Sequence, residues 1–389
     1  MSVHLPREIF LDNNATTQPL LEVIAAVNAA MSNSFGNPSS SNRAGERARW
    51  LLQDSREAIA ELIGAQSDSV CFTSGATEAN NWVLQRTCMQ PNSSLVTTEI
   101  EHSSIKSLCE VMENHGTPVC RLPTDQLGRI DAQQLAESLK PDTTLVSVHW
   151  VNNETGVIQP VEEIARLCRE RGILFHADAS QAVGKLPVNV EQLGCDFLTF
   201  SGHKFHGPQG VGGLFVRPGV QLPPLIFGGG QELGRRPGTE NLPGIAGAGA
   251  AASARNKMLT QAISALAQLR DSFEQSVFQQ IPDVFVNGDR TNRVCNTTNL
   301  RFEGVDGEAL IARLDQRGIR CSQSSACMNR RPEPSYVLRA MGLSELQAYA
   351  SVRFSFSLLN SPEEAEVAVG ILAEEVVKLR SFARTFTGD

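Results

Sequence analysis

Three short segments of the chain carry polar side chains that could serve chemistry, and each of them follows an apolar run. The first, SGATEAN at residues 74–80, places glycine and small polar residues between a strand pattern and a helix pattern. Backbone N–H groups at such a helix start favour an anion, so we expect Ala76 and Thr77 to bind a phosphate group. The alternative is an ordinary helix N-terminus that Ser74 caps.

The other two segments end strand patterns with ionisable groups. HADASQ (176–181) puts Asp178 after a run so apolar that its carboxylate should be buried, which is costly without a cationic or donating partner. SGHKFHGPQG (201–210) puts Lys204 after the next strand pattern, where loss of hydration lowers the pKa of a lysine and makes its amine nucleophilic. Taken singly, a cap or an ion pair explains Asp178, and a surface loop explains Lys204.

In combination, the three segments predict a site for pyridoxal 5'-phosphate. The phosphate group of this cofactor needs the helix start, its pyridine nitrogen needs an anion that keeps it protonated, and its aldehyde needs a lysine for a Schiff base. Asp178 and Lys204 are separated by 204 − 178 = 26 residues, which leaves room for one helix and one strand between neighbouring positions of a sheet.

Two further residues could act on a substrate. The stretch 322–338, SQSSACMNRRPEPSYVL, places Cys327 among serines, charges and prolines, a composition typical of an exposed loop in which nearby arginines favour the thiolate. The stretch 350–357, ASVRFSFS, places Arg353 in an alternating strand, where its planar guanidinium could bind a carboxylate. The alternatives are a bystander cysteine and an ion-paired strand arginine.

The elements that must position these residues alternate between strand and helix patterns through the first two thirds of the chain. Such alternation predicts an α/β fold with a mainly parallel sheet covered on both faces, whose ligands gather at the carboxyl ends of the strands. The last third begins with a long helical pattern at 261–281 and continues with shorter mixed patterns. It predicts a smaller α+β unit, with a boundary near residue 255.

Composition narrows the class of protein. The chain has 389 residues, of which 41% are hydrophobic and 20% charged, as in ordinary globular proteins. Its net charge of −8 excludes the basic surface that nucleic acid or an anionic membrane requires. Nine cysteines without a C-x-x-C argue against a disulfide framework and a thiolate metal site. We therefore expect a cytoplasmic protein with no metal and no membrane segment.

The motifs together resemble the cysteine desulfurases of the NifS/IscS-like group, within the class V aminotransferase superfamily. The resemblance implies the fold type I of pyridoxal-phosphate-dependent transferases, which is aspartate aminotransferase-like, in a homodimer. It also implies a large cofactor-binding domain over 16–254 and a small domain from 1–15 and 255–389, which carries a nucleophile loop at about 322–334. The matching segments include IFLDNNATT (9–17), FTSGATEANN (72–81), HADASQAVGK (176–185), SGHKFHGPQGVG (201–212), GGGQELGRRPGTEN (228–241), SSAC (324–327) and SVRFSF (351–356).

Residue roles follow from the same resemblance. Lys204 would be the Schiff-base lysine, Asp178 the partner of the pyridine nitrogen, and Cys327 the nucleophile that takes sulfur from L-cysteine as a persulfide and passes it to an acceptor protein. His102 would stack on the ring and assist proton transfer, and Gln181 would bind the ring oxygen. The other implied contacts are the phosphate ligands Ala76, Thr77, Ser201 and His203, Thr239 from the partner subunit, and the substrate-carboxylate ligands Asn153 and Arg353.

Some positions depart from the family pattern, and some alternatives stay open. Asn42 stands where relatives often have histidine, and Ser322 and Gln323 stand where glycine is commoner. The longer C-terminal tail with which some relatives bind an iron–sulfur scaffold has no clear counterpart, so the acceptor is an iron–sulfur scaffold, a tRNA-thiolation protein or a DNA-sulfur-modification partner. The alternative functions are a selenocysteine or cystine lyase and a catalytically inactive binding partner.

Overall fold

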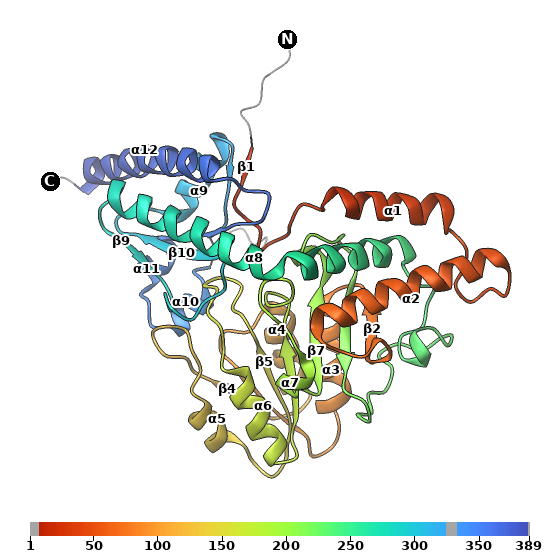
Figure 1. The fold of residues 1–389 in the computed structure, drawn as a ribbon. Coiled ribbons are helices and arrows are strands. Elements are labelled where there is room, and N and C mark those ends of the chain that lie inside the picture. Colours follow the sequence, from red (N-terminus) through yellow and green to blue (C-terminus); the bar gives the residue numbers. More distant parts are fainter. Residues whose placement is uncertain (1–7, 324–332, 388–389) are drawn as a thin grey trace.

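The computed structural model describes residues 8–323 and 333–387, and a seven-stranded sheet forms its centre (Figure 1). The strand order is β2-β8-β7-β6-β5-β3-β4. Within this sheet β8 alone runs opposite to the other six strands, so the predicted mainly parallel sheet is confirmed. The strands are β2 (Val70–Thr73), β3 (Ser94–Thr98), β4 (Val119–Leu122), β5 (Thr143–His149), β6 (Leu174–Asp178), β7 (Phe197–Ser201) and β8 (Gly212–Val216).

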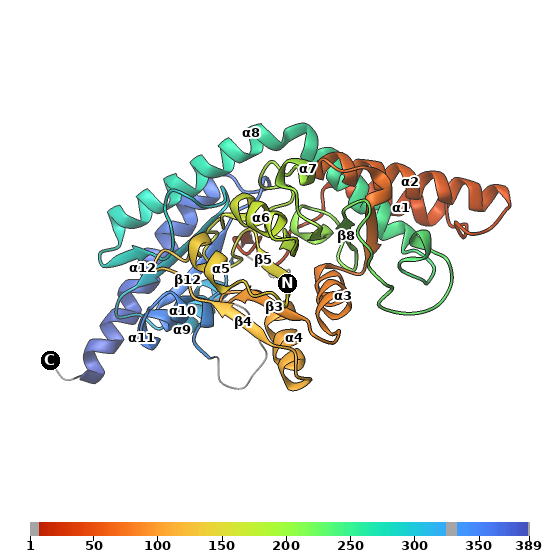
Figure 2. The same cartoon turned by 90° about the horizontal axis from the view of Figure 1, so that it is seen from below.

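Helices cover both faces of this sheet because successive side chains of each strand point to opposite sides. Along β7, Leu198 and Phe200 belong to one hydrophobic core and Phe197 to the other. Figure 2 shows the two layers, with α6 and α7 on one side of β5 and with α4 on the other. The first core contains α2 (Arg43–Ile63), α5 (Ala132–Ser138), α6 (Val161–Glu170), α7 (Val190–Leu193) and α8 (Leu242–Gln280), and the second contains α3 (Ala76–Cys88) and α4 (Ser103–Asn114).

A second, antiparallel sheet of three strands is built from the C-terminal third, in the order β12-β10-β9. A short parallel pair, β1 (Ile9–Phe10) with β11 (Ile319–Arg320), joins the N-terminal residues to this part of the molecule. The remaining elements are β9 (Val284–Val286), β10 (Thr297–Phe302), β12 (Ser351–Ser355), α1 (Leu21–Asn33), α9 (Gly307–Gln316), α10 (Tyr336–Ala340), α11 (Glu345–Tyr349), α12 (Pro362–Thr387) and the short 3-10 turns η1 (Ser67–Ser69), η2 (Gly202–Lys204) and η3 (Glu232–Gly234).

The long helix α8 differs from the sequence prediction. It begins at Leu242 rather than at residue 261, because the glycine- and alanine-rich stretch before residue 255 is helical and buried. Its small residues allow close packing: a Cβ at Gly249 would lie 2.7 Å from the Cα of Ser55. Residue 255 thus lies inside α8, which runs past both sheets (Figure 1), and the division into two domains stays a proposal.

Asn42, the position that departs from the family pattern, has a local role. Its side-chain oxygen accepts a hydrogen bond of 2.9 Å from the backbone N–H of Gly45, so it caps α2. The same helix ends at Gly64, whose φ of 63° is left-handed and favours glycine. Within the described ranges, no helix combines the length and the apolar composition that a membrane span requires.

Candidate active site

A cavity of about 720 Å³ opens at the carboxyl ends of β5, β6 and β7, beside the smaller sheet. Ten of the predicted site residues line it: Ala76, Thr77, His102, Asn153, Asp178, Gln181, Ser201, His203, Lys204 and Arg353. Thr239 does not line it and is exposed in the segment before α8. Cys327 lies outside the described residues.

The start of α3 faces this cavity without a side-chain cap. Gly75 is its N-cap residue, and within the described chain no side chain accepts from the first N–H groups of the helix. Ser74 does not cap the helix, because Gly75 occupies the N-cap position; the N–H of Ser74 donates to Glu78 Oε2 at 2.9 Å. The N–H groups of Ala76 and Thr77 are therefore unused by the helix, and the positive end of its dipole faces the cavity, as a phosphate site requires.

Asp178 ends β6 with its carboxylate almost fully buried. Its Oδ1 accepts from the N–H of Ser180 at 2.9 Å and from the hydroxyl of Ser180 at 2.5 Å, and its Oδ2 accepts from Asn80 at 2.8 Å. Burial by itself raises the pKa of this carboxyl, but the bonds from Ser180, the nearby His102 and the Asn80 amide together hold the pKa below its usual value. Asp178 thus presents a fixed negative charge to the cavity.

Lys204 follows β7, the strand next to β6, as the spacing predicted. Its Nζ donates to the backbone oxygens of Asn14 at 2.7 Å and Ala15 at 2.8 Å. Burial, together with the positive charge of Arg353, lowers the pKa of Lys204 to about 8 from 10.5. About a tenth of this amine is therefore neutral, and nucleophilic, at pH 7, far more than for a lysine with the ordinary pKa of 10.5.

Two histidines of the cavity wall are also held in place. His102 opens onto the cavity as the N-cap of α4, and its Nδ1 lies 2.9 Å from the hydroxyl of Ser104. The walls still limit its hydration, which lowers its pKa, although the charge of Asp178 opposes this. For His203, burial and the neighbouring lysines lower the pKa to about 4, so it is a neutral donor beside Thr16, 3.1 Å from its Nδ1.

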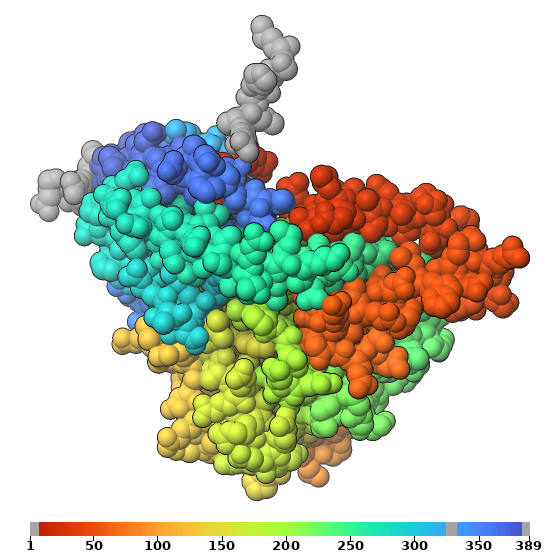
Figure 3. Space-filling view, viewed as in Figure 1, coloured from red at the N-terminus to blue at the C-terminus, as the bar shows by residue number. Residues whose placement is uncertain are grey.

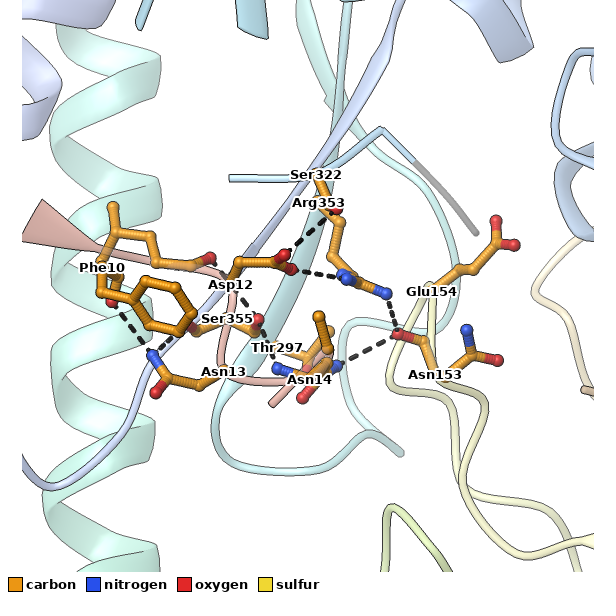
Figure 4. A network of polar contacts seen from close by, with 12 residues as sticks. Phe10, Asp12, Asn13, Asn14, Asn153, Glu154, Thr297, Ser322, Arg353 and Ser355 are labelled. Carbon is orange, nitrogen blue, oxygen red and sulfur yellow. Dashed lines mark hydrogen bonds and ion pairs between the residues drawn. The ribbon is translucent and has the colours of Figure 1, made fainter. Parts of the chain in front are cut away.

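Arg353 projects from β12 into the far side of the cavity (Figure 4). Its Nη1 donates to the backbone oxygen of Asn153 at 3.0 Å, and its Nη2 donates to Asp12 at 2.6 Å. The ion pair that was the alternative to a substrate-binding role is therefore present. These bonds use two of the five N–H donors of the guanidinium, so donors remain for a carboxylate, while its buried Nε has no partner among the described residues.

Comparison with known proteins assigns the family. The sequence profile described as aminotransferase class-V matches residues 9–367. The chain belongs to the aminotransferase class-V family. A cysteine desulfurase of Trichormus azollae is 41% identical over 377 residues, which are 96% of this chain and 94% of the relative. This class-V family member is thus similar to the cysteine desulfurases, as the motifs indicated.

Solved structures agree with the sequence comparison. A NifS-like protein has a TM-score of 0.90 and 32% identity to this class-V family member, covering 95% of this chain and 100% of the other. A structure of SspA in complex with cysteine has a TM-score of 0.81 and 35% identity, covering 90% of this chain and 99% of that one. These likenesses, together with the observed α/β architecture, confirm the predicted fold type I of the family.

The cysteines of the described chain do not suit the role of nucleophile. All eight are free, and all except the half-buried Cys120 are buried. Burial raises the pKa of Cys109 and of Cys168 to about 12, so these thiols stay protonated. None of the eight lines the cavity. Within this class-V family member, Cys327 remains the predicted nucleophile, and no described residue competes with it.

The structure adds site residues that the sequence prediction did not assign. Asp12 and Asn14 lie in the quoted IFLDNNATT motif without an assigned role, and both line the cavity. Asn14 accepts at its side-chain oxygen from the buried Lys185, which also donates to Gln181 Oε1 at 2.5 Å. His149, a polar residue at the end of an apolar strand, lines the cavity too. Among the described residues, no group of side chains could hold a metal ion.

Proposed function

We propose that the protein is a pyridoxal-phosphate-dependent cysteine desulfurase, which converts L-cysteine to L-alanine and transfers the sulfur to Cys327 as a persulfide. One observation carries the proposal: a single cavity holds an uncapped helix start, the buried anion Asp178 and the low-pKa amine of Lys204. The likeness to cysteine desulfurases and to SspA in complex with cysteine supports the choice of substrate.

The residues present fit pyridoxal phosphate. When bound, this cofactor supplies an aldehyde that condenses with amines and a pyridine ring that withdraws electrons from the carbon next to the substrate amine. Its phosphate group would be held by the start of α3 and by Ser201 and His203, with Asp178 facing the pyridine nitrogen. Gln181 would bind the ring oxygen, and His102 would lie against the ring. The chemistry of these residues supports this assignment, because N–H and O–H donors would face the phosphate group and a carboxylate would face the pyridine nitrogen.

Each protein group then has a physical task. Lys204 Nζ, with a pKa of about 8, would hold the cofactor aldehyde until the substrate amine replaces it, and Lys204 or His102 would take up the proton from the carbon next to that amine. Arg353 orients the substrate carboxylate with the donors that Asp12 and Asn153 leave unused. Asp178 keeps its negative charge because its hydrogen bonds outweigh the cost of its burial. His102 provides a second site for protons at the cavity mouth.

The sulfur step conserves atoms. The thiol of Cys327 would attack the sulfur of the substrate, forming an S–S bond while the bond between that sulfur and the β-carbon breaks. L-cysteine and the enzyme thiol thus become L-alanine and the enzyme persulfide. The segment 322–334 starts at the cavity, since Ser322 is one of its lining residues. The chain from Ser322 to Cys327 spans at most about 18 Å when extended, a length that would let the thiol act in the cavity.

A homodimer is part of this proposal. The projecting side of the molecule formed by α1 and α2 (Figure 3) carries exposed apolar side chains, namely Leu21, Met31, Phe35 and Trp50. Such a surface is typical of an interface between subunits. Thr239 is exposed and outside its own cavity, which agrees with a contact to the phosphate group in the partner subunit.

The acceptor of the sulfur is a protein, and the proposal leaves open whether it is an iron–sulfur scaffold or a tRNA- or DNA-thiolation enzyme. Eight free thiols among the described residues support a reducing compartment, so we place the protein in the cytoplasm. No direct nucleic-acid partner is proposed, because the net charge of −8 is unfavourable for one.

The test is to load the purified protein with pyridoxal phosphate and to measure its turnover of L-cysteine, L-selenocysteine and L-cystine in parallel. The proposal predicts alanine from L-cysteine, with loss of turnover in Cys327→Ala and retained cofactor absorbance. Turnover of selenocysteine alone, or turnover of cystine that survives Cys327→Ala, would instead support a lyase. A bound cofactor without any turnover would support the inactive binding partner.

A further inference from the structure

A buried asparagine links the two halves of the candidate site. Asn80 lies in α3 behind the cavity wall, is 0% exposed and does not line the cavity. Its Nδ2 donates to Asp178 Oδ2 at 2.8 Å and to the hydroxyl of Ser104 at 2.9 Å. Its Oδ1 accepts from the hydroxyl of Thr199 at 2.7 Å. Every hydrogen of this amide is thus used, and its oxygen has a partner.

The chemistry of the neighbours fixes which way this amide faces. An ionised carboxylate only accepts hydrogen bonds, so Asp178 requires the NH₂ end of Asn80. The reverse orientation would put two acceptors 2.8 Å apart at a side chain that is 0% exposed to solvent. Thr199, whose hydroxyl can donate, completes the arrangement on the other side.

The same amide directs the hydroxyl hydrogen of Ser104 toward His102. Because the Ser104 oxygen accepts from Asn80, its hydroxyl hydrogen is free to donate to His102 Nδ1, 2.9 Å away. The backbone N–H of Ser104 also donates to this nitrogen, at 3.2 Å. A ring nitrogen that accepts two hydrogen bonds carries no proton, and a neutral imidazole then has its proton on Nε2. The lowered pKa of His102 agrees with the neutral ring.

We propose that Asn80 is a positioning residue which holds Asp178 as a charged acceptor and His102 with its proton on Nε2. It acts only through these two groups and through Ser104, because it does not itself reach the cavity. The proposal deepens the proposed function, on which it rests for the purpose of the site. The arrangement ties the anion that faces the pyridine nitrogen to the imidazole that handles protons, through one side chain.

The experiment separates the two hydrogen bonds that Asn80 donates, one to Asp178 and one to Ser104. The chain without cofactor is labelled with ¹⁵N in its seven histidines, and the ring signals of His102 are assigned from their loss in His102→Gln. In a parallel measurement, the Kd for pyridoxal phosphate is determined from the visible absorbance. The variants are Asn80→Ala, which removes the hydrogen bonds to both Asp178 and Ser104, and Ser104→Ala, which removes only the hydroxyl that links Asn80 to His102.

The native chain is expected to show His102 with an unprotonated Nδ1 and a protonated Nε2. Asn80→Ala should shift the Nδ1 signal and raise the Kd for pyridoxal phosphate about tenfold, the effect of losing one hydrogen bond to a charged group. Ser104→Ala should shift the Nδ1 signal while the Kd stays within about twofold of the native value. The matched control is Asn287→Ala, since Asn287 is another buried amide whose Nδ2 donates twice, at 2.7 and 2.9 Å.

A protonated Nδ1 in the native chain would overturn the proposal, and so would an unchanged Nδ1 signal in Ser104→Ala. An unchanged Kd in folded Asn80→Ala would do the same. If Asn80→Ala does not fold, the ¹⁵N spectrum of Ser104→Ala still decides, because Ser104 is only partly buried at a helix start. Failure of the native chain to bind pyridoxal phosphate would contradict the proposed function alone, because the ¹⁵N readout needs no cofactor.

Discussion

The guanidinium of Arg353 donates to the carboxylate of Asp12 at 2.6 Å, across 341 residues of sequence. This ion pair joins β12 to the loop after β1 at the wall of the candidate site (Figure 4). A second donor of the guanidinium is fixed by the backbone oxygen of Asn153. The position of Arg353 is thus set before any substrate binds, which lowers the entropic cost of binding a carboxylate.

Replacing Arg353 by lysine therefore tests the substrate contact. A lysine ammonium is a point charge and cannot serve Asp12, Asn153 and a planar carboxylate at the same time. We expect Arg353→Lys to raise the KM for L-cysteine about tenfold or more. The measurement is the rate of alanine formation against cysteine concentration. Arg301→Lys, on the adjacent strand β10, is the control and should leave KM unchanged, since Arg301 pairs with Glu303 at 2.8 Å. An unaltered KM in Arg353→Lys would contradict the assignment.

The pKa of Lys204 predicts how cofactor capture depends on pH. Because burial lowers this pKa to about 8, the neutral amine becomes the major form only above that pH. The rate at which the chain without cofactor develops visible absorbance with pyridoxal phosphate should rise with pH and level off above about 8. Lys204→Ala should develop no such absorbance, whereas Lys106→Ala, at a half-buried lysine outside the cavity that pairs with Glu110, should behave as the native chain does. A rate that rises only near 10.5 would show that the amine is not perturbed.

The free energy of unfolding should also depend on pH because of the lowered pKa of Lys204. In the unfolded chain Lys204 binds its proton up to about pH 10.5, and in the folded chain only up to about 8. The unfolded state therefore binds more protons between these values, and the free energy of unfolding gains a positive slope with pH from this residue. Denaturant titrations of the native chain and of Lys204→Met, with no cofactor present, measure the slope. Equal slopes in the two proteins would be inconsistent with a lowered pKa.

Asp178 should matter for turnover rather than for folding alone. Asp178→Asn keeps the shape of the side chain but removes the negative charge that faces the pyridine nitrogen. We expect kcat to fall about a hundredfold or more, the usual scale for losing one preorganised electrostatic contact. Asp196→Asn is the control: this buried carboxylate binds Arg217 at 2.6 Å outside the cavity, so its loss should lower Tm but not kcat. A kcat of Asp178→Asn near the native value would remove the residue from the mechanism.

The packing of α8 can be tested independently of chemistry. A Cβ at Gly249 would lie 2.7 Å from the backbone of Ser55, so Gly249→Val should lower the free energy of unfolding by about 2 kcal/mol or more. A Cβ at Gly370 in α12 would meet nothing within 4 Å, so Gly370→Ala should raise this free energy by up to about 1 kcal/mol. Equal effects of the two changes in urea titrations would contradict the close contact of α8 with α2.

Much of the site could be predicted from sequence, because its polar residues directly follow apolar strands. Asp178 and Lys204 stand at the carboxyl ends of β6 and β7, which are neighbours in one parallel sheet. Parallel strands bring such ends to one edge, so order along the chain was enough to place the two groups together. The start of α3 was predictable for the same reason, since it follows β2 directly.

Other features depend on contacts between distant segments, which local patterns do not contain. The pair Asp12–Arg353 forms because the N-terminal strand β1 joins β11 in the C-terminal third. Asn80 is an ordinary polar residue in a helical pattern, and only the packing of α3 against β6 and β7 buries it beside Asp178. The start of α8 was placed too late, because its small residues lack the apolar periodicity of a helix that packs with large side chains.

The transfer of sulfur from L-cysteine to Cys327 can be followed by mass spectrometry of the enzyme after a single turnover. The protein with pyridoxal phosphate is mixed with one equivalent of L-cysteine, free thiols are blocked, and the peptides are analysed together with the alanine formed. The proposed function predicts one alanine per site and the mass of one additional sulfur atom on the peptide that contains Cys327, with no such addition on the other eight cysteines. Alanine formed at the native rate by Cys327→Ala, or additional sulfur on a different cysteine, would contradict it.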